Sequence, residues 1–200
     1  WWTKDLGTPW HNMAVDEALL QALTPASPPL LRYYGWDRPT VSIGYFQRHD
    51  TPLPPNQTLV RRPTGGGLVW HEHDFTFTLV LPASHHLCRE DRWASYRLVH
   101  QAMADGLASE GLGCDLAEAS AAVPDPERLQ CFASHARYDL MCGELKLAGG
   151  AQRRTARGLL HQGSLNPRAC PQISHPQLLA GLAAGWQLLL GSHSTPFSPS

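Results

Sequence analysis

Hydrophobic residues recur at helical spacing in three segments of the chain. In the first segment, Val15, Leu19 and Leu23 lie on one helical face, and Asn12 precedes them as a predicted N-cap. In the second, Gly111 follows the last periodic residue and is a natural helix terminator. The spacing predicts helices over residues 12–23, 96–110 and 176–190.

Short apolar or alternating segments, typical of strands, lie between these helices. From Phe75 to Leu81, large apolar residues alternate with threonine and then become continuous, as in a strand buried first on one face and then on both. Cys142-Gly143-Glu144 separates two such segments and predicts a hairpin, whereas Leu116–Gln130 lacks periodicity and predicts a loop. The predicted strands are residues 30–34, 40–43, 59–62, 75–81, 138–141, 145–148 and 158–165.

Strands that occur in runs, interrupted by helices without strict alternation, predict an α+β fold with a mixed, largely antiparallel sheet flanked by helices. A chain of 200 residues is long enough for one domain with its own core. We expect one domain over residues 1–190 and a flexible tail rich in Ser, Pro and His over 191–200.

Composition excludes two large classes of partner. Lys and Arg number 16 against 17 Asp and Glu, a formal net charge of −1, so no general positive field is available to bind nucleic acid. No apolar run approaches the roughly 18 residues that span a membrane, and no secretion signal opens the sequence. We expect a soluble, cytoplasmic protein that binds neither nucleic acid nor membrane.

The five cysteines form no CxxC pair, and an odd number cannot close entirely into disulfides. A zinc ribbon and a disulfide scaffold are therefore both disfavoured, and we predict no metal site. Each cysteine is either a small buried apolar residue, which is the common case, or a reactive thiol. Cys131, at the end of the irregular segment, is the candidate nucleophile.

Three adjacent glycines, Gly65, Gly66 and Gly67, directly follow a predicted strand and leave backbone amides open to an approaching ligand. Arg61 and Arg62 beside them could donate hydrogen bonds to a carboxylate or phosphate. The alternative is a flexible turn with two solvated arginines. The spacing matches neither the Walker A nor the dinucleotide-binding pattern.

Lys146 lies between two leucines in a predicted strand, ahead of the small residues 149–151, which we interpret as a second turn. A lysine in this setting extends either to solvent, the more common case, or into a site. His161 precedes Gln162-Gly163 in an extended segment. By itself it is more typical of a packed or surface histidine than of a base.

Taken together, these stretches resemble the lipoate-protein ligase and octanoyltransferase family, whose catalytic fold is shared with biotin protein ligases. The resemblance covers about residues 11–166, and several motifs in family order are far more specific than any one of them. The matching segments are residues 12–20, 31–36, 39–47, 61–67, Lys146 with Gly149-Gly150-Ala151-Gln152, and 161–165.

The resemblance implies a tunnel for an acyl chain, in which Lys146 contacts the acyl carbonyl or the adenylate. A cation fixed in an apolar slot stabilises a developing oxyanion better than one in water. Two positions depart from the family pattern: the acid after His71 stands at Glu72 or Asp74, and Gln162 separates His161 from glycine. The residues implied to bind substrate are Arg61, Arg62, Gly65, Gly66, Gly67, His71, Gly149, Gly150, Ala151 and His161.

Two branches of the family activate the acyl group differently. Ligases use ATP, Mg and the free acid to make an acyl-adenylate, and many carry an extra C-terminal domain. Octanoyltransferases take the acyl group from a carrier thioester, and Cys131-Phe132 lies where one of their branches places its nucleophile. Because only about 35 residues follow the His161 motif, too few for an extra domain, we expect a transferase that requires no cofactor.

The expected reaction moves an octanoyl or lipoyl group from an acyl carrier protein or an acylated donor protein to a lysine of an acceptor. Cys131 carries the group as a thioester, and the acceptor is a lipoyl domain or a glycine-cleavage H-type protein. We expect a monomer. The alternatives are an ATP-dependent lipoate-protein ligase, a biotin ligase, and a non-catalytic homologue that binds acyl groups or lipoyl domains.

Overall fold

The computed structural model describes residues 2–48, 54–119 and 135–191, and the elements below are those of this part of the chain. The helices are α1 (Pro9–Ala22), α2 (Arg92–Ser109) and α3 (His175–Leu190), with 3₁₀ turns η1 (His86–Cys88) and η3 (Pro167–Ala169). The strands are β1 (Trp2–Gly7), β2 (Leu30–Trp36), β3 (Thr40–Ile43), β4 (Thr58–Arg61), β5 (Val69–His71), β6 (Phe75–Pro82), β7 (Asp115–Leu116), β8 (Leu140–Cys142), β9 (Leu145–Thr155) and β10 (Gly158–Leu165).

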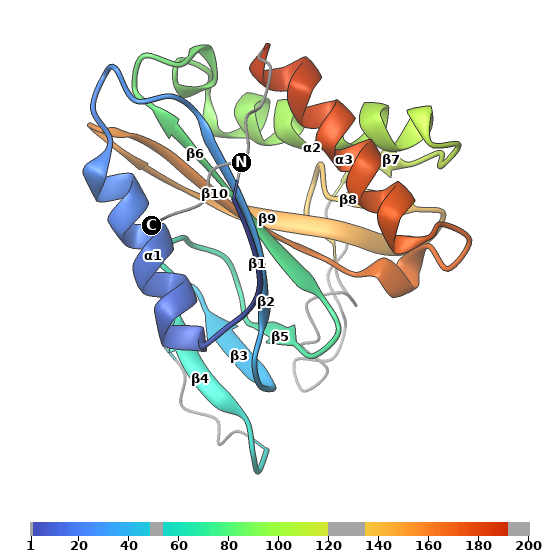
Figure 1. The fold of residues 1–200 in the computed structure, drawn as a ribbon, viewed down its shortest axis with the longest axis horizontal. Coiled ribbons are helices and arrows are strands. Elements are labelled where there is room, and N and C mark those ends of the chain that lie inside the picture. Colours follow the sequence, from blue (N-terminus) through green and yellow to red (C-terminus); the bar gives the residue numbers. More distant parts are fainter. Residues whose placement is uncertain (1, 49–53, 120–134, 192–200) are drawn as a thin grey trace.

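The strands form two sheets. Seven pair in the order β1-β2-β6-β10-β9-β8-β7, and three form a smaller sheet in the order β4-β3-β5. The pairs β1–β2 and β3–β4 are parallel and the others are antiparallel. The predicted α+β fold with a mixed, largely antiparallel sheet is therefore confirmed. Figure 1 shows the smaller sheet beyond one end of the larger one, next to α1.

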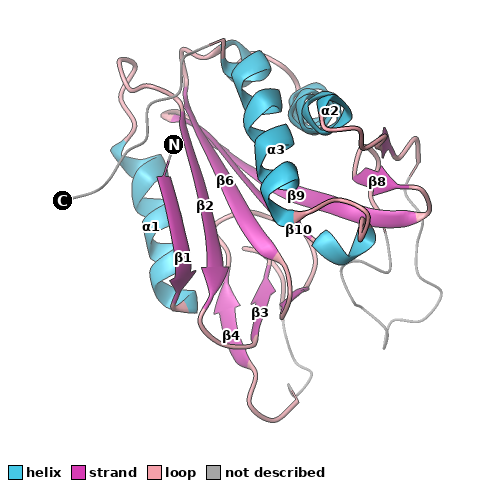
Figure 2. Ribbon diagram, turned by 45° about the vertical axis from the view of Figure 1, so that its right-hand side comes forward, coloured by secondary structure: helices cyan, strands magenta, loops and turns pink. Residues whose placement is uncertain are grey.

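Helices cover both faces of the larger sheet. Helices α2 and α3 pack against each other over one face, and α1 lies on the opposite face (Figures 1 and 2). The main core, which includes Leu79, Leu107 and Leu159, lies between the sheet and the α2–α3 pair. On the opposite face, Leu20 of α1 and Leu23, which directly follows α1, pack against the sheet.

The predicted helices are confirmed, although α1 and α2 begin earlier than the hydrophobic pattern indicated. Helix α1 begins at Pro9 and is capped by the side chain of Thr8, so the prediction that Asn12 is its N-cap was wrong. A proline at the first helical position after a capping threonine defines this earlier start. Asn12 is instead buried within the helix, where its amide donates to the Gly35 carbonyl at 3.0 Å. Asp91 similarly caps α2.

Several strand predictions needed correction. The predicted turn at residues 149–151 was wrong, because these residues continue β9. The strand predicted from residue 138 begins only at Leu140, because Tyr138 has a left-handed backbone. Strands β1, β5 and β7 were missed. The predicted loop at 116–130 and tail at 191–200 fall mostly in residues 120–134 and 192–200, outside the described part of the chain.

A buried ion pair connects α1 to the larger sheet. Arg32 of β2 donates to Oδ1 of Asp16 in α1 at 2.7 Å, and both side chains are fully buried. Oδ2 of Asp16 accepts from Tyr34, Thr78 and Gln162, each at 2.7 Å. Arg32, Thr78 and Gln162 occupy paired positions on β2, β6 and β10. One carboxylate therefore binds a row of side chains that crosses three strands.

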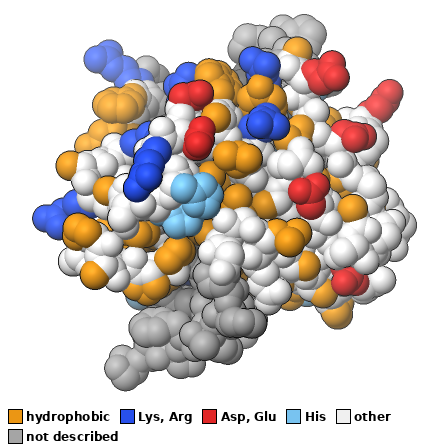
Figure 3. All heavy atoms as spheres, turned by 90° about the horizontal axis from the view of Figure 1, so that it is seen from above, with side chains coloured by type: hydrophobic (Ala, Val, Ile, Leu, Met, Phe, Trp, Pro, Cys, Tyr) orange, Lys and Arg blue, Asp and Glu red, His pale blue; other side chains and the backbone are white. Residues whose placement is uncertain are grey.

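Two features of the structure bear on the composition of the chain: the hydrophobicity of its helices and the side chains on its surface. Among the described helices, none combines the length and the apolar character needed to cross a membrane. On the face shown in Figure 3, basic side chains lie mainly on the left and acidic ones mainly on the right, with apolar side chains across the whole face.

Replacing Asp16 by Asn is expected to destabilise the protein by about 3–5 kcal/mol, because it removes the carboxylate that balances the buried Arg32 guanidinium. Glu17→Gln is the matched control. Glu17 pairs with Arg153 at 3.3 Å while its side chain is 44% exposed, and such a pair contributes less than about 1 kcal/mol. Urea denaturation of both variants measures the difference, and equal losses would contradict a central role for the buried pair.

Candidate active site

A cavity of about 320 Å³ lies between strands β9 and β10 and the turn that follows β4. Met13, Trp36, Leu68 and Val69 give it apolar walls, and Lys146 borders it. The volume falls near the lower end of the range of about 300–1,000 Å³ that is usual for ligand sites.

Gly66 and Gly67 of the glycine turn, residues 64–67, line this cavity, and hydrogen bonds from neighbouring side chains fix the turn. Gly66 has a φ of 88°, which side-chain-bearing residues rarely adopt. Nη2 of Arg62 donates to two carbonyls of the turn, at 2.9 and 2.6 Å, and the threonine hydroxyl of the turn donates to Oε1 of Gln162 at 2.6 Å. Because Gln162 also binds Asp16, the turn is connected to the buried ion pair.

Both arginines before the turn bind backbone carbonyls. Nη1 of Arg62 donates to the carbonyl and the hydroxyl of Ser42 at 2.8 and 2.7 Å. Nη1 of Arg61 donates to the carbonyls of Gly44, Tyr45 and Gln47 at 2.9, 3.0 and 2.7 Å. The two side chains thus hold the loops around the cavity, a role that the sequence pattern did not indicate.

Lys146 extends from β9 into the cavity, and only 9% of its side chain is exposed. Its Nζ lies 2.7 Å from Oδ2 of Asp139, which is almost fully buried. Oδ1 of Asp139 accepts from the Tyr96 hydroxyl at 2.5 Å, and Oδ2 accepts from the Ala136 N–H at 2.7 Å. The carboxylate that balances the lysine therefore has two further donors of its own.

The lysine–aspartate pair occupies the space that a side chain at position 149 would fill. A Cβ on Gly149 would lie 2.5 Å from Cε and 2.6 Å from Nζ of Lys146, and 3.0 Å from Oδ1 of Asp139. Only glycine at this position leaves the pair in place. The N–H of the next residue, Gly150, donates to the Tyr96 hydroxyl oxygen at 2.8 Å, which joins β9 to the same network.

The backbone before Asp139 is held in an unusual conformation. Tyr138 has a φ of 68°, which costs a non-glycine residue roughly 1–3 kcal/mol. Two hydrogen bonds fix it: Nδ1 of His100 in α2 donates to the Tyr138 carbonyl at 2.6 Å, and the Tyr138 N–H donates to the Ala117 carbonyl at 2.7 Å. This turn directs Asp139 toward Lys146.

Two buried histidines lie behind the cavity. The ring of Tyr96 is 4.3 Å from that of His100 and 5.4 Å from that of His161, measured between centroids. Within the described part of the chain, Nε2 of neither histidine has a hydrogen-bond partner. Burial lowers the pKa of His100 to about 4, and burial together with His100 holds the pKa of His161 well below its usual value. Both rings are therefore neutral at pH 7.

His71 borders the cavity and belongs to a Ser-His-Asp arrangement. Its Nδ1 donates to Oδ2 of Asp74 at 2.7 Å, which leaves Nε2 to accept from the Ser42 hydroxyl at 2.7 Å. Ser42 is fully buried and already accepts from Arg62, so it is not placed to attack a substrate. The arrangement instead orients His71, whose ring stacks on Trp36 with centroids 4.1 Å apart.

Most of the predicted binding residues border the cavity. Arg61, Gly65 and His161 are not among the described residues that line it, and His161 lies behind Gly150, where an added Cβ would be 2.5 Å from Nε2. Cys131 falls outside the described residues. The predicted residues that line the cavity are Arg62, Gly66, Gly67, His71, Lys146, Gly149, Gly150 and Ala151.

Two residues that organise the site were not predicted to do so. Asp139 and Tyr96 stand in no motif. The β8–β9 hairpin brings Asp139 to Lys146, and the approach of α2 to β9 brings Tyr96 there. The acid that pairs with His71 is Asp74, which resolves the ambiguity between it and Glu72.

The buried histidines predict a loss of stability in mild acid. The unfolded chain protonates His100 near pH 6.5 and the folded chain only near pH 4, so between these values the unfolded state binds more protons. His100 should therefore remove up to about 3 kcal/mol from the free energy of unfolding as the pH falls from 6.5 to 4.

His100→Asn removes this titration and retains a donor for the Tyr138 carbonyl, so its stability should depend less on pH over that range. His73→Asn, at an exposed position, should show the pH dependence of the unsubstituted protein. Urea denaturation at pH 7.5 and 5 compares the three proteins. If the free energy of unfolding changed equally between the two pH values in His100→Asn and in the unsubstituted protein, the low pKa of His100 would be refuted.

Comparison with known proteins gives consistent matches. The octanoyltransferase LipM of Macrococcus caseolyticus is 34% identical over 169 residues, which are 78% of this chain and 61% of that relative. This chain spans about three fifths of the relative's length, so its shortness does not favour a transferase over a ligase.

Two solved structures share the fold. Lipoate-protein ligase A bound with ATP has a TM-score of 0.76 at 21% identity, covering 98% of this chain and 87% of that one. A bi-partite lipoate protein ligase from Thermoplasma acidophilum, studied with its E2 lipoyl domain, has a TM-score of 0.71 at 19% identity, covering 98% and 86%.

The family model of the lipoyl protein ligase A/B catalytic domain matches residues 8–172, which contain the glycine turn, Lys146 and its partner Asp139. The chain belongs to this family.

Proposed function

We propose that this protein is an acyltransferase of protein lipoylation, which moves an octanoyl or lipoyl group from a carrier-protein thioester to an acceptor lysine through a Cys131 thioester. The observation that carries the proposal is the buried ammonium of Lys146 at an apolar-walled cavity. The 34% identity to an octanoyltransferase supports the choice of reaction.

The cavity walls suit an alkyl chain. Met13, Trp36, Leu68 and Val69 offer apolar surface. Burial contributes about 0.8 kcal/mol for each methylene, or about 5 kcal/mol for the six methylenes of an octanoyl group. This burial energy is enough to select an octanoyl chain over an acetyl group. The carbonyl end of the chain then lies near Lys146.

The described chain next to Cys131 supports its assignment as the nucleophile. His135 and Ala136, four and five residues after it, line the same cavity as Lys146. Four residues of extended chain span at most about 14 Å. Covalent geometry therefore allows Cys131 to act at this cavity.

The reaction proceeds in two balanced steps. The Cys131 thiolate attacks the donor thioester carbonyl, a new carbon–sulfur bond forms, and the carrier sulfur leaves and takes a proton. The amine of the acceptor lysine then attacks the acyl-enzyme and forms an amide. The Cys131 thiolate is released, and the proton lost by the amine passes to solvent.

Lys146 stabilises the oxyanion that develops in each step. Its ammonium donates a hydrogen bond to the carbonyl oxygen and sits in a site largely shielded from water, where such a bond is strongest. Asp139 keeps its bonds from Tyr96 and Ala136 when the lysine turns toward the substrate. The counter-charge is therefore already solvated by the protein, which reduces reorganisation.

The reaction requires two protein partners and no added cofactor. The donor is an acyl carrier protein or an acylated donor protein, and the acceptor is a lipoyl domain or an H-type protein. We propose that the protein acts as a monomer in the cytoplasm.

Lys146→Met should lower the single-turnover rate of acyl transfer by about 10²–10³-fold, the usual loss when an oxyanion donor is removed. Lys4→Met is the matched control, because Lys4 is the only other lysine in the sequence, and it should retain the full rate. Circular dichroism verifies that both variants are folded. An unchanged rate in folded Lys146→Met would contradict the role of this lysine.

Mixing the protein with octanoyl carrier protein should give one octanoyl group on the Cys131 peptide, measured by mass spectrometry. Cys131→Ser should abolish this adduct and the transfer. Cys88→Ser should preserve both, because Cys88 lies half-buried after β6 and donates to the Pro82 carbonyl at 3.2 Å.

Two other outcomes would redirect the assignment. ATP-dependent release of pyrophosphate with free octanoate, unaffected by Cys131→Ser, would identify a ligase that uses ATP and Mg. Retention of an acyl ligand without transfer under either condition would identify a non-catalytic binding protein.

A further inference from the structure

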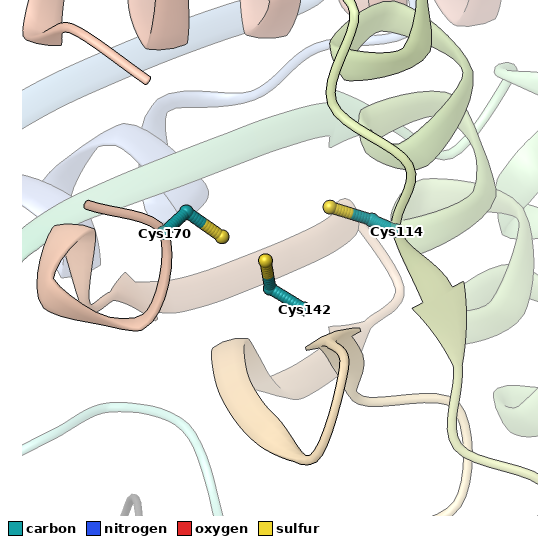
Figure 4. Close-up of side chains that lie close together, drawn as sticks. All are labelled: Cys114, Cys142 and Cys170. Carbon is teal, nitrogen blue, oxygen red and sulfur yellow. The ribbon is translucent and has the colours of Figure 1, made fainter. Parts of the chain in front are cut away.

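Three of the five cysteines converge away from the cavity. Cys114 precedes β7, Cys142 ends β8 and Cys170 follows η3, and their Sγ atoms all lie within 4.8 Å of one another. Figure 4 shows the three sulfurs pointing toward a common centre from three different elements. The cysteines are far apart in sequence, so the spacing rules that exclude a zinc ribbon could not detect them.

The arrangement has nearly the dimensions of a metal site. Two sulfurs bound to one tetrahedral Zn²⁺ at about 2.3 Å lie about 3.8 Å apart, so side-chain shifts of about 1 Å or less would place all three on a single ion. Cys170 is fully buried, whereas Cys114 and Cys142 are half-buried. The buried side holds the cluster against the core, and the partly exposed side gives an ion a route of entry.

The three thiols differ from a cysteine that only fills space. Cys88 donates to the backbone carbonyl of Pro82, whereas Cys114 and Cys170 interact sulfur to sulfur. A donor also faces the cluster, because the Gln172 amide approaches Sγ of Cys142 at 3.4 Å. Amide donors of this kind stabilise thiolate ligands.

We propose that Cys114, Cys142 and Cys170 form a thiolate site for one Zn²⁺ ion, with a water molecule at the fourth position. On binding, each thiol releases its proton to solvent and its sulfur donates a lone pair to the ion, with no change in oxidation state. Soft sulfur ligands in a tetrahedral arrangement favour zinc over the hard ions Mg²⁺ and Ca²⁺.

The ion would join three elements near the active site. Cys142 directly follows Met141, which pairs across the hairpin with Lys146. Cys114 precedes Asp115, which pairs with Met141 from the other side. A bound ion would therefore brace the strands that carry the lysine, whether or not the acyl transfer proposed above is the reaction.

The test titrates Co²⁺, a spectroscopic probe of zinc–thiolate sites, into the full chain under reducing conditions in a Cys131→Ser background. We expect one equivalent of Co²⁺ to give a thiolate-to-cobalt charge-transfer band that one equivalent of Zn²⁺ removes. At a hundredfold excess over Kd, Zn²⁺ should raise Tm by about 5–10 °C. Cys142→Ser should weaken binding at least tenfold, and Cys88→Ser should bind as tightly as the parent.

Three results would overturn the proposal: no charge-transfer band in the reduced parent, binding by folded Cys142→Ser that equals that of the parent, or loss of binding in Cys88→Ser. A disulfide between two of the three cysteines in freshly purified protein would also overturn it in favour of a redox pair. If Cys142→Ser does not fold, elemental analysis of the zinc-loaded parent after gel filtration decides the question, and anything well below one zinc per chain counts against the site.

Discussion

The architecture around the cavity depends on the buried charge pair between Asp16 and Arg32. Two charges removed from water impose a large desolvation cost, which is offset only when geometry and further hydrogen bonds are good. Here Oδ2 of Asp16 accepts three additional hydrogen bonds, one of them from Gln162. Gln162 in turn accepts from Thr64, so the glycine turn is held by the same network that attaches α1 to the sheet. The same polar contacts therefore stabilise the fold and the site. A substitution that displaces Asp16 in α1 would also displace the glycine turn at the cavity.

Lysine and arginine have different roles around the cavity. Lys4 and Lys146 are the only lysines among 16 basic residues. Arg32, Arg61 and Arg62 use their several donors to fix carbonyls, hydroxyls or a carboxylate of the scaffold. A compact ammonium with rotatable donors suits the position at the cavity, because its hydrogen bonds can be redirected without the planar constraint of a guanidinium.

The sequence predicted the helices, in which burial of one face produces a repeating pattern of hydrophobic residues, and the longer strands. All three helices were located because one buried face leaves a repeating pattern. Residues 158–165 also match β10, although this strand is buried at every position. Strands β5 and β7 are too short to show any period. Within the site, Lys146 and His71 stand in recognisable local motifs, but Asp139 and Tyr96 do not. Asp139 acquires its role when the β8–β9 hairpin forms, and Tyr96 when α2 packs near β9. The three clustered cysteines likewise meet only in the folded chain.

Gly149 affects how natural variants of this protein should be interpreted. A change from glycine to alanine removes no charge and no hydrogen-bonding group, and any comparison of side-chain chemistry scores it as conservative. At this position the added methyl group would compete for the volume that the Lys146 ammonium now fills. Such a variant would look neutral in a list of substitutions and yet displace the end of the Lys146 side chain, because the position of the lysine–aspartate pair depends on an absent side chain.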